Sequence, residues 1–185
     1  SPMVTANGGE IWRRPHDLLR RVPLPTDTVA ELYRLAERHE EVWFWAYAAQ
    51  GLFNRKSWPE DVHACEWLKF GYYTEDRGIL DRIREELVAW GGLEITNSHP
   101  NNLEINAAGV SKAAAIEEVC RLIGCSLAEA AAIGDSLNDI SAIRACGLGI
   151  AMKNAQDEVK AAADAVTDSN NEDGVARAIR EFILN

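Results

Sequence analysis

The stretch AAAIGDSLNDISAI, residues 130–143, decides the fold. A short run of small apolar residues ends at Gly134, and two aspartates, Asp135 and Asp139, follow it with Asn138 between them. A strand that leads through polar residues straight into a helix is typical of parallel α/β sheets, in which ligands bind beyond the carboxyl ends of the strands. The stretch therefore predicts a ligand site at one end of a parallel sheet.

The sequence after residue 108 alternates between strand-like and helix-like segments. Helices are predicted over 111–124, 137–147, 154–163 and 172–184, and strands over 130–134, 148–152 and 164–167. Strict alternation predicts a parallel sheet wrapped by helices. In the first of these helices, apolar spacing predicts four inward side chains: Ile116, Val119, Cys120 and Ile123.

The sequence before residue 104 has a different composition, because all six tryptophans lie before residue 91. Amphipathic helices are predicted over 25–39 and 76–90, the second with Trp90 inward, aromatic strands over 41–49 and 67–73, and a hairpin over 93–107. Residues 3–6 predict a strand ended by the turn 7–9. The predicted fold class is α/β. Residues 1–10 and 104–185 form an incomplete parallel core, and residues 11–103 form a second α/β layer.

Composition and charge argue against several classes of function. The 185 residues carry a net charge of −10, with a pI of about 4.9, which disfavours a nucleic-acid-binding protein. No apolar run approaches the ~18 residues of a membrane-spanning helix, and no secretory signal is recognisable. The four cysteines are scattered, and the four histidines show no metal-ligand spacing. We therefore expect a cytoplasmic protein that binds neither nucleic acid nor membranes.

The aspartates permit two interpretations. Asp135, at the end of a strand, can offer a hard oxygen ligand to Mg²⁺, and Asn138 and Asp139 lie in the first helical turn, which favours anions. Alternatively, Ser136 and Asp139 form a capping box and Asp135 is a turn residue.

Lys112 follows Ser111, the predicted N-cap, so its cation lies at the positive end of a helix dipole. That placement costs about 0.3–1 kcal/mol unless a bound phosphate reverses the interaction. The alternative is a lysine that points into solvent, where screening makes the cost trivial.

Several motifs carry a resemblance to a known family. They are GVSKAAAIEEVCRLIG (109–124), AAAIGDSLNDISAI (130–143), AMKNA (151–155) and VTDSNNEDGVA (166–176). In this order they resemble the C-terminal half of haloacid dehalogenase (HAD)-like hydrolases, and more narrowly the Cof-type (subfamily IIB) phosphatases. The resemblance implies a Rossmann-like HAD core with an inserted α/β cap domain. VTANGGEIW (4–12) is similar to the segment that leads into the cap.

The resemblance also implies roles for the site residues. Asp135 would bind Mg²⁺ and Asp139 would orient the waters of the metal and neighbouring groups. Lys112 would bind the phosphoryl group and balance the charge of the nucleophile. Asn138 would contact the phosphate. The implied catalytic residues are Lys112, Asp135 and Asp139, with Mg²⁺ as cofactor and Lys112 and Asn138 as substrate-binding residues.

The nucleophile of the family is not recognisable in this sequence. The reaction requires an aspartate in an Asp-x-Asp motif that forms an aspartyl-phosphate, and no Asp-x-Asp-Gly occurs here. The motif precedes the cap in the family, so we expect its segment to be lacking and this chain alone to be inactive. Three explanations are open: the segment was omitted or cut away, it is supplied by another chain, or the chain is a natural remnant that lost it. We expect the unpaired strand edge to favour self-association.

The leading hypothesis is a Mg²⁺-dependent phosphatase of small phosphorylated metabolites such as sugar phosphates. The alternatives are an inactive remnant that acts as a binding or interaction protein, and a sugar-phosphate mutase. In the cap, aromatic side chains could stack on the substrate or belong to the core: Trp43, Trp45, Tyr47, Trp58 and Trp67. Asn154 could line the site or cap a helix.

Overall fold

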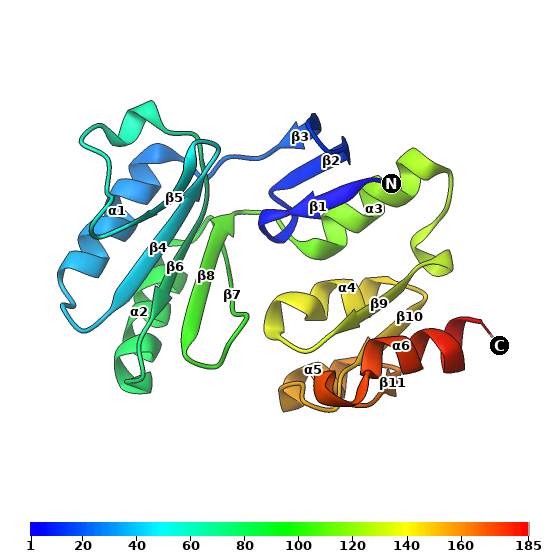
Figure 1. Cartoon of the computed structure of the whole chain (residues 1–185). Helices are drawn as coiled ribbons and strands as arrows, with labels where there is room; N and C mark the ends of the chain where they lie inside the picture. Colours follow the sequence, from blue (N-terminus) through cyan, green and yellow to red (C-terminus); the bar gives the residue numbers. More distant parts are fainter. Residues whose placement is uncertain (185) are drawn as a thin grey trace. The chain divides into compact units, whose positions relative to one another are not determined.

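The computed structural model describes residues 1–184 and divides the chain into two compact units, Ser1–Val110 and a second that begins at Ser111 (Figure 1). Each unit has its own cluster of buried apolar side chains. The assignment of residues 1–10 to the same domain as 104–185 stays a prediction; β1 (Met3–Thr5) pairs here with β2 (Glu10–Arg14).

The first unit contains two antiparallel sheets, with strand orders β1-β2-β3 and β5-β4-β6-β8-β7. The remaining strands are β3 (Asp17–Arg21), β4 (Trp43–Ala48), β5 (Gly51–Asn54), β6 (Trp67–Tyr73), β7 (Leu93–Thr96) and β8 (Asn102–Ala107). The helices are α1 (Thr26–Glu37) and α2 (Arg77–Trp90). The predicted strands, helices and 93–107 hairpin are thus confirmed.

Alternating side chains give the larger sheet two different faces. Phe44, Phe70 and Leu103 are fully buried in a cluster that includes α1 and α2. The Tyr72 hydroxyl donates a hydrogen bond to the Leu32 carbonyl oxygen of α1 at 2.7 Å. Trp43, one position from Phe44, is 52% exposed. One face therefore forms the core, and the other presents aromatic and polar side chains.

The second unit confirms the predicted parallel sheet. Its strands β9 (Ala131–Gly134), β10 (Leu148–Ala151) and β11 (Ala165–Val166) are parallel in the order β11-β10-β9. Its helices are α3 (Lys112–Ile123), α4 (Ile140–Ala145), α5 (Asp157–Ala162) and α6 (Gly174–Ala178), followed by a π-helical segment (Ile179–Ile183). The predicted α/β fold class therefore holds.

Two side chains predicted to face the core lie at the surface. Trp90 is 38% exposed and Ile123 is 59% exposed. Each is the last residue of its helix and precedes a glycine with positive φ, Gly91 or Gly124. No further helical turn follows to cover these side chains, so periodicity alone overestimated their burial.

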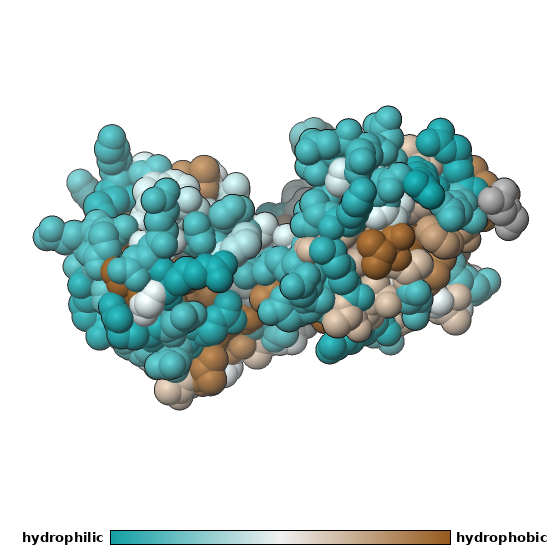
Figure 2. Space-filling model, turned by 90° about the horizontal axis from the view of Figure 1, so that it is seen from below, coloured by the Kyte–Doolittle hydropathy of each residue, from teal (hydrophilic) through white to brown (hydrophobic). Residues whose placement is uncertain are grey.

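Hydrophilic side chains cover most of the face shown in Figure 2, in keeping with the net charge of −10. Among residues 1–184, no helix has the length and apolar character needed to cross a membrane.

Candidate active site

The candidate site begins where β9 ends. Gly134 closes this strand, and a Cβ atom placed on it would lie 2.3 Å from the Cβ atom of Asp139. The Asp139 side chain therefore folds back onto the strand end and occupies the space that a larger residue at position 134 would need.

Asp139 connects the turn to a cation. Its Oδ2 accepts hydrogen bonds from the backbone N–H groups of Asp135 (3.0 Å) and Ser136 (3.2 Å). The capping box between Ser136 and Asp139 is present, as one of the two interpretations predicted. The other carboxylate oxygen of Asp139, Oδ1, forms an ion pair with Lys112. The same carboxylate thus caps the turn and binds the lysine.

Lys112 is brought to this turn from the start of α3. Ser111 caps the helix by accepting a hydrogen bond from the Ala114 N–H at 3.2 Å. The Lys112 ammonium pairs with Asp139 and donates to Asn138 Oδ1 at 3.2 Å, and its side chain is 31% exposed. The alternative of a lysine that points into solvent is therefore wrong. Lys112, Asn138 and Asp139 form one cluster in the structure, and the roles that the resemblance implies for them stay predictions.

Asp135 lies on the solvent side of this turn. Asp135 is exposed, and its Oδ2 accepts a hydrogen bond from Asn154 Nδ2 at 3.1 Å. Asn154 Oδ1 in turn accepts from the Asn170 N–H at 2.9 Å. Asp135, Asn154 and Asn170 follow β9, β10 and β11 in turn, so the polar groups gather at the carboxyl ends of all three parallel strands.

Sequence reasoning anticipated part of this arrangement. It predicted that Asn154 either lines the site or caps a helix, and in the structure the side-chain amide of Asn154 donates a hydrogen bond to Asp135. It missed Asn170 and the hydroxyl of Ser136, which donates to Asp135 Oδ1 at 3.4 Å. Their positions just after predicted strands were the available signal.

The oxygen ligands at this turn are compatible with one kind of Mg²⁺ site. Among residues 1–184, no group of three or more His, Cys, Asp or Glu side chains is arranged to hold a metal ion. Asp139 is committed to Lys112 and two N–H groups, which leaves the exposed carboxylate of Asp135. Mg²⁺ is commonly bound by one or two carboxylates together with substrate phosphate and water. Asp135 therefore fits a shared metal–substrate site rather than an all-protein cage.

Fold and site together define an α/β protein with a lysine-centred polar site at the ends of parallel strands. A family model described as haloacid dehalogenase-like hydrolase matches residues 54–179. The chain is 46% identical over 182 residues to the 5-amino-6-(5-phospho-D-ribitylamino)uracil phosphatase YcsE of Bacillus subtilis (strain 168), covering 98% of this chain and 72% of that protein. It is 38% identical over 183 residues to a phosphoglycolate phosphatase of Methanoculleus marisnigri, covering 97% and 71%.

Solved structures agree in fold. A haloacid dehalogenase-like hydrolase from B. subtilis gives a TM-score of 0.87 at 21% identity, covering 99% of this chain and 80% of that one. A HAD subclass IIB sugar phosphatase gives 0.82 at 24% identity, covering 98% and 75%. The chain belongs to the haloacid dehalogenase-like hydrolase family, and by this family resemblance it is a HAD-like phosphatase.

Proposed function

We propose that the protein is a Mg²⁺-dependent phosphatase of small phosphate monoesters, and that Lys112, Asn138, Asp139 and Asp135 form its phosphoryl site. The cluster of Lys112, Asn138 and Asp139 beside Asp135 carries the proposal. Phosphoryl transfer depends mainly on positioning and on neutralising charge, and this cluster offers both.

Lys112 is the phosphoryl-binding residue. An ammonium group has three N–H donors. Asn138 and Asp139 engage two of them, which leaves one to bind a phosphoryl oxygen. Asn138 and Asp139 act as positioning residues, because they fix the direction of that donor. A fixed donor costs little reorganisation when charge develops on the phosphoryl group.

Asp135 is the proposed metal ligand. Its exposed carboxylate can share Mg²⁺ with the phosphate of the substrate. When bound, Mg²⁺ supplies positive charge against the phosphoryl oxygens. Asn154 holds one Asp135 oxygen through its amide N–H and keeps the carboxylate at the carboxyl end of β9.

The relatives suggest the substrate. One acts by name on a phosphorylated ribitylaminouracil and another on phosphoglycolate. The relative with 46% identity is the more similar of the two, so we propose a phosphate ester of a sugar or sugar alcohol. The location proposed with this function is the cytoplasm.

The direct experiment measures phosphate release by the complete product of the gene, with ribitol 5-phosphate, sugar phosphates and phosphoglycolate as substrates. We expect turnover that requires Mg²⁺. Asp135→Asn and Lys112→Met should each lower kcat/KM by about 100-fold or more. Lys160→Met is the matched control, because Lys160 forms a surface ion pair with the fully exposed Asp157 and should leave kcat/KM unchanged.

A second readout avoids turnover. Titration of the chain with inorganic phosphate, followed by calorimetry, should show binding that Lys112→Met weakens and Lys160→Met does not. Full activity in Lys112→Met would reduce the cluster to a structural cap. Transfer of the phosphoryl group to a second sugar instead of water would favour the mutase.

A further inference from the structure

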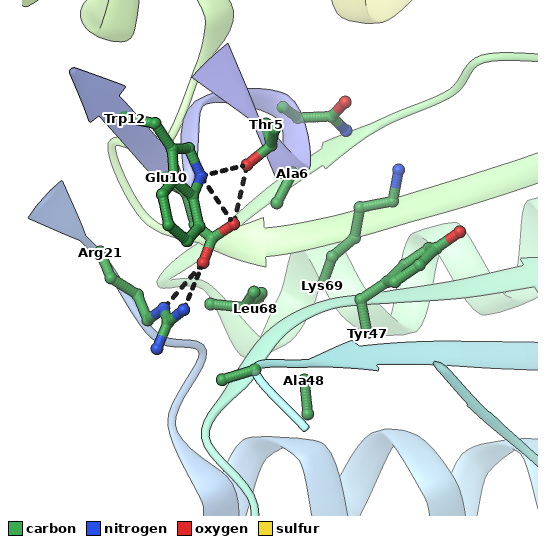
Figure 3. A pocket seen from close by; sticks show the side chains of 11 residues that line it. Thr5, Ala6, Glu10, Trp12, Arg21, Tyr47, Ala48, Leu68 and Lys69 are labelled. Carbon is green, nitrogen blue, oxygen red and sulfur yellow. Dashed lines mark hydrogen bonds and ion pairs between the residues drawn. The ribbon is translucent and has the colours of Figure 1, made fainter. Parts of the chain in front are cut away.

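The first unit contains a cavity that the proposed phosphatase site does not use. Its volume is about 430 Å³, within the range of small-molecule pockets. Two sheets of the unit contribute to it: the small sheet β1-β2-β3 and strands β4 and β6 of the larger sheet. Figure 3 shows one group of polar side chains around Glu10 and another formed by Tyr47 and Lys69.

The polar group around Glu10 is internally satisfied. Glu10 accepts hydrogen bonds from the Thr5 hydroxyl (2.7 Å) and the Trp12 indole (3.3 Å), and it pairs with Arg21 at 2.7 Å (Figure 3). Arg21 also pairs with Glu66 at 2.6 Å. A carboxylate has about four acceptor sites, so this group forms a rigid wall and has little capacity left for a ligand.

The second polar group retains hydrogen-bonding capacity. Tyr47 and Lys69 are register partners on β4 and β6. Lys69 pairs with Glu104 at 2.8 Å, and its side chain is only 11% exposed. Within residues 1–184 this is the only partner the structure gives its ammonium, and the Tyr47 hydroxyl receives none. Lys69 and Tyr47 both line the cavity, and they keep two ammonium N–H groups and a hydroxyl that a ligand could use.

Strand β8 holds the surrounding backbone in place. Asn106 is 2% exposed, and its amide donates to the carbonyl oxygens of Ala6 (3.0 Å) and Leu68 (2.9 Å), two residues that line the cavity. Ala6 and its neighbour Asn7 have φ angles of 50° and 58°. Non-glycine residues adopt this conformation at a cost of about 1–2 kcal/mol each, so the wall is held in shape against local strain. A preformed wall lowers the cost of binding.

We propose that this cavity binds a neutral small molecule whose hydroxyl or carbonyl oxygens accept hydrogen bonds from Lys69 and Tyr47. The charges at the cavity are already paired, as Arg21 with Glu10 and Lys69 with Glu104, so nothing favours an anion. Ala48, Ala49 and Leu68 supply an apolar surface. Dephosphorylation of a small ester releases a neutral alcohol of this class, and that link rests on the proposed function.

The test measures binding without turnover. The chain labelled with ¹⁵N is titrated with ribitol, a polyol, and separately with uracil, a cyclic amide. Saturable shifts are expected for the Trp12 indole N–H and for the backbone N–H groups of Tyr47, Ala48 and Lys69. A response to either probe supports the site and identifies the oxygen chemistry. No saturable shift with either probe, or a stronger response to inorganic phosphate, overturns the proposal.

Two variants separate binding from stability. Tyr47→Phe removes only a hydroxyl from a side chain that is 43% exposed, and it should weaken binding about 3- to 10-fold. Lys69→Met should weaken binding at least about 10-fold. The exposed Lys56 provides the control, because Lys56→Met should not change the dissociation constant. Equal affinities in all three variants overturn the proposal, and the unfolding of Lys69→Met would leave Tyr47→Phe to decide.

This outcome is independent of the proposed function. Phosphatase activity of the complete gene product without binding of either probe overturns the proposal for the cavity and leaves the proposed function standing. Binding of ribitol or uracil without phosphatase activity of the complete gene product overturns the phosphatase alone.

Discussion

At the scale of single residues, the candidate site depends on the missing side chain of Gly134. An alanine Cβ atom there would lie 2.3 Å from Asp139 Cβ and 2.4 Å from its Cγ. Asp139 is held by Lys112 and by two backbone N–H groups, so it cannot move without losing these partners. We expect Gly134→Ala to lower the free energy of unfolding by about 2–3 kcal/mol, measured by urea denaturation.

Gly78 provides the control for this substitution. It lies in α2, and a Cβ atom there would lie 3.3 Å from the end of the Asp76 side chain. Gly78→Ala should change the free energy of unfolding by no more than about 1 kcal/mol. If Gly134→Ala were as stable as the wild type, Asp139 would be free to leave the strand end.

The residues at the site differ in how far the sequence predicts them. Asp135 and Asp139 follow a strand pattern, so local spacing placed both at the sheet end. Local spacing could not show that Asp139 fills the space beside Gly134, because that contact depends on the path of the turn between them. The amide of Asn154 reaches Asp135 from the turn that follows another strand, β10, and no local pattern encodes that distance.

At the scale of elements, the start of α3 determines where Lys112 lies. Ser111 accepts a hydrogen bond from the Ala114 N–H at 3.2 Å, and Lys112 is the first helical residue. Loss of this cap should cost about 0.5–2 kcal/mol. Ser111→Ala should therefore lower both the free energy of unfolding and the affinity for inorganic phosphate.

Ser111→Asn is the matched variant, because asparagine also caps helices well. It should restore most of the stability and the phosphate affinity. A stability loss in Ser111→Ala with unchanged phosphate affinity would show that Lys112 is positioned by Asn138 and Asp139 alone.

Elements were predicted well where the pattern was long or strictly alternating. The helix predicted over 25–39 is α1, Thr26–Glu37, and two residues of its apolar face, Val29 and Leu32, are fully buried. Burial at helix ends was predicted less well, as Trp90 and Ile123 show. Periodicity identifies the face of a helix, but the length over which a neighbouring element covers that face is a property of the packed structure.

At the scale of the whole molecule, carboxylates with lowered pKa values occur in both units. Burial raises the pKa of Glu104, but the ammonium of Lys69 and hydrogen bonds from Asn7 and Ser98 outweigh burial and hold the pKa below its usual value of 4.5. Hydrogen bonds from Ser126 and Ser169 hold the pKa values of two exposed carboxyls below the same value, those of Glu129 and Glu172.

These shifts fix the sign of the acid response. The unfolded chain, with carboxyl pKa values near 4.5, binds more protons than the folded chain as the pH falls below about 5. The stabilisation from these carboxylates is complete above the unfolded pKa and is lost as the pH falls through the folded pKa values. The free energy of unfolding should therefore decrease from about pH 5 to about pH 3.

Lys69→Met tests the origin of this response in the first unit. Glu104 is a buried residue, only 3% exposed, and without the ammonium its carboxylate loses its ion pair, so the variant should be less stable by about 2–4 kcal/mol at neutral pH. Protonation of Glu104 removes the charge that Lys69 balances, so the deficit should shrink as the pH falls below about 5. Lys56→Met, on an exposed loop, should follow the wild type at every pH. The free energy of unfolding is measured by urea denaturation at each pH. If the stability deficit of Lys69→Met stayed constant across the pH range, lost packing of the lysine stem, and not the paired charge, would account for it.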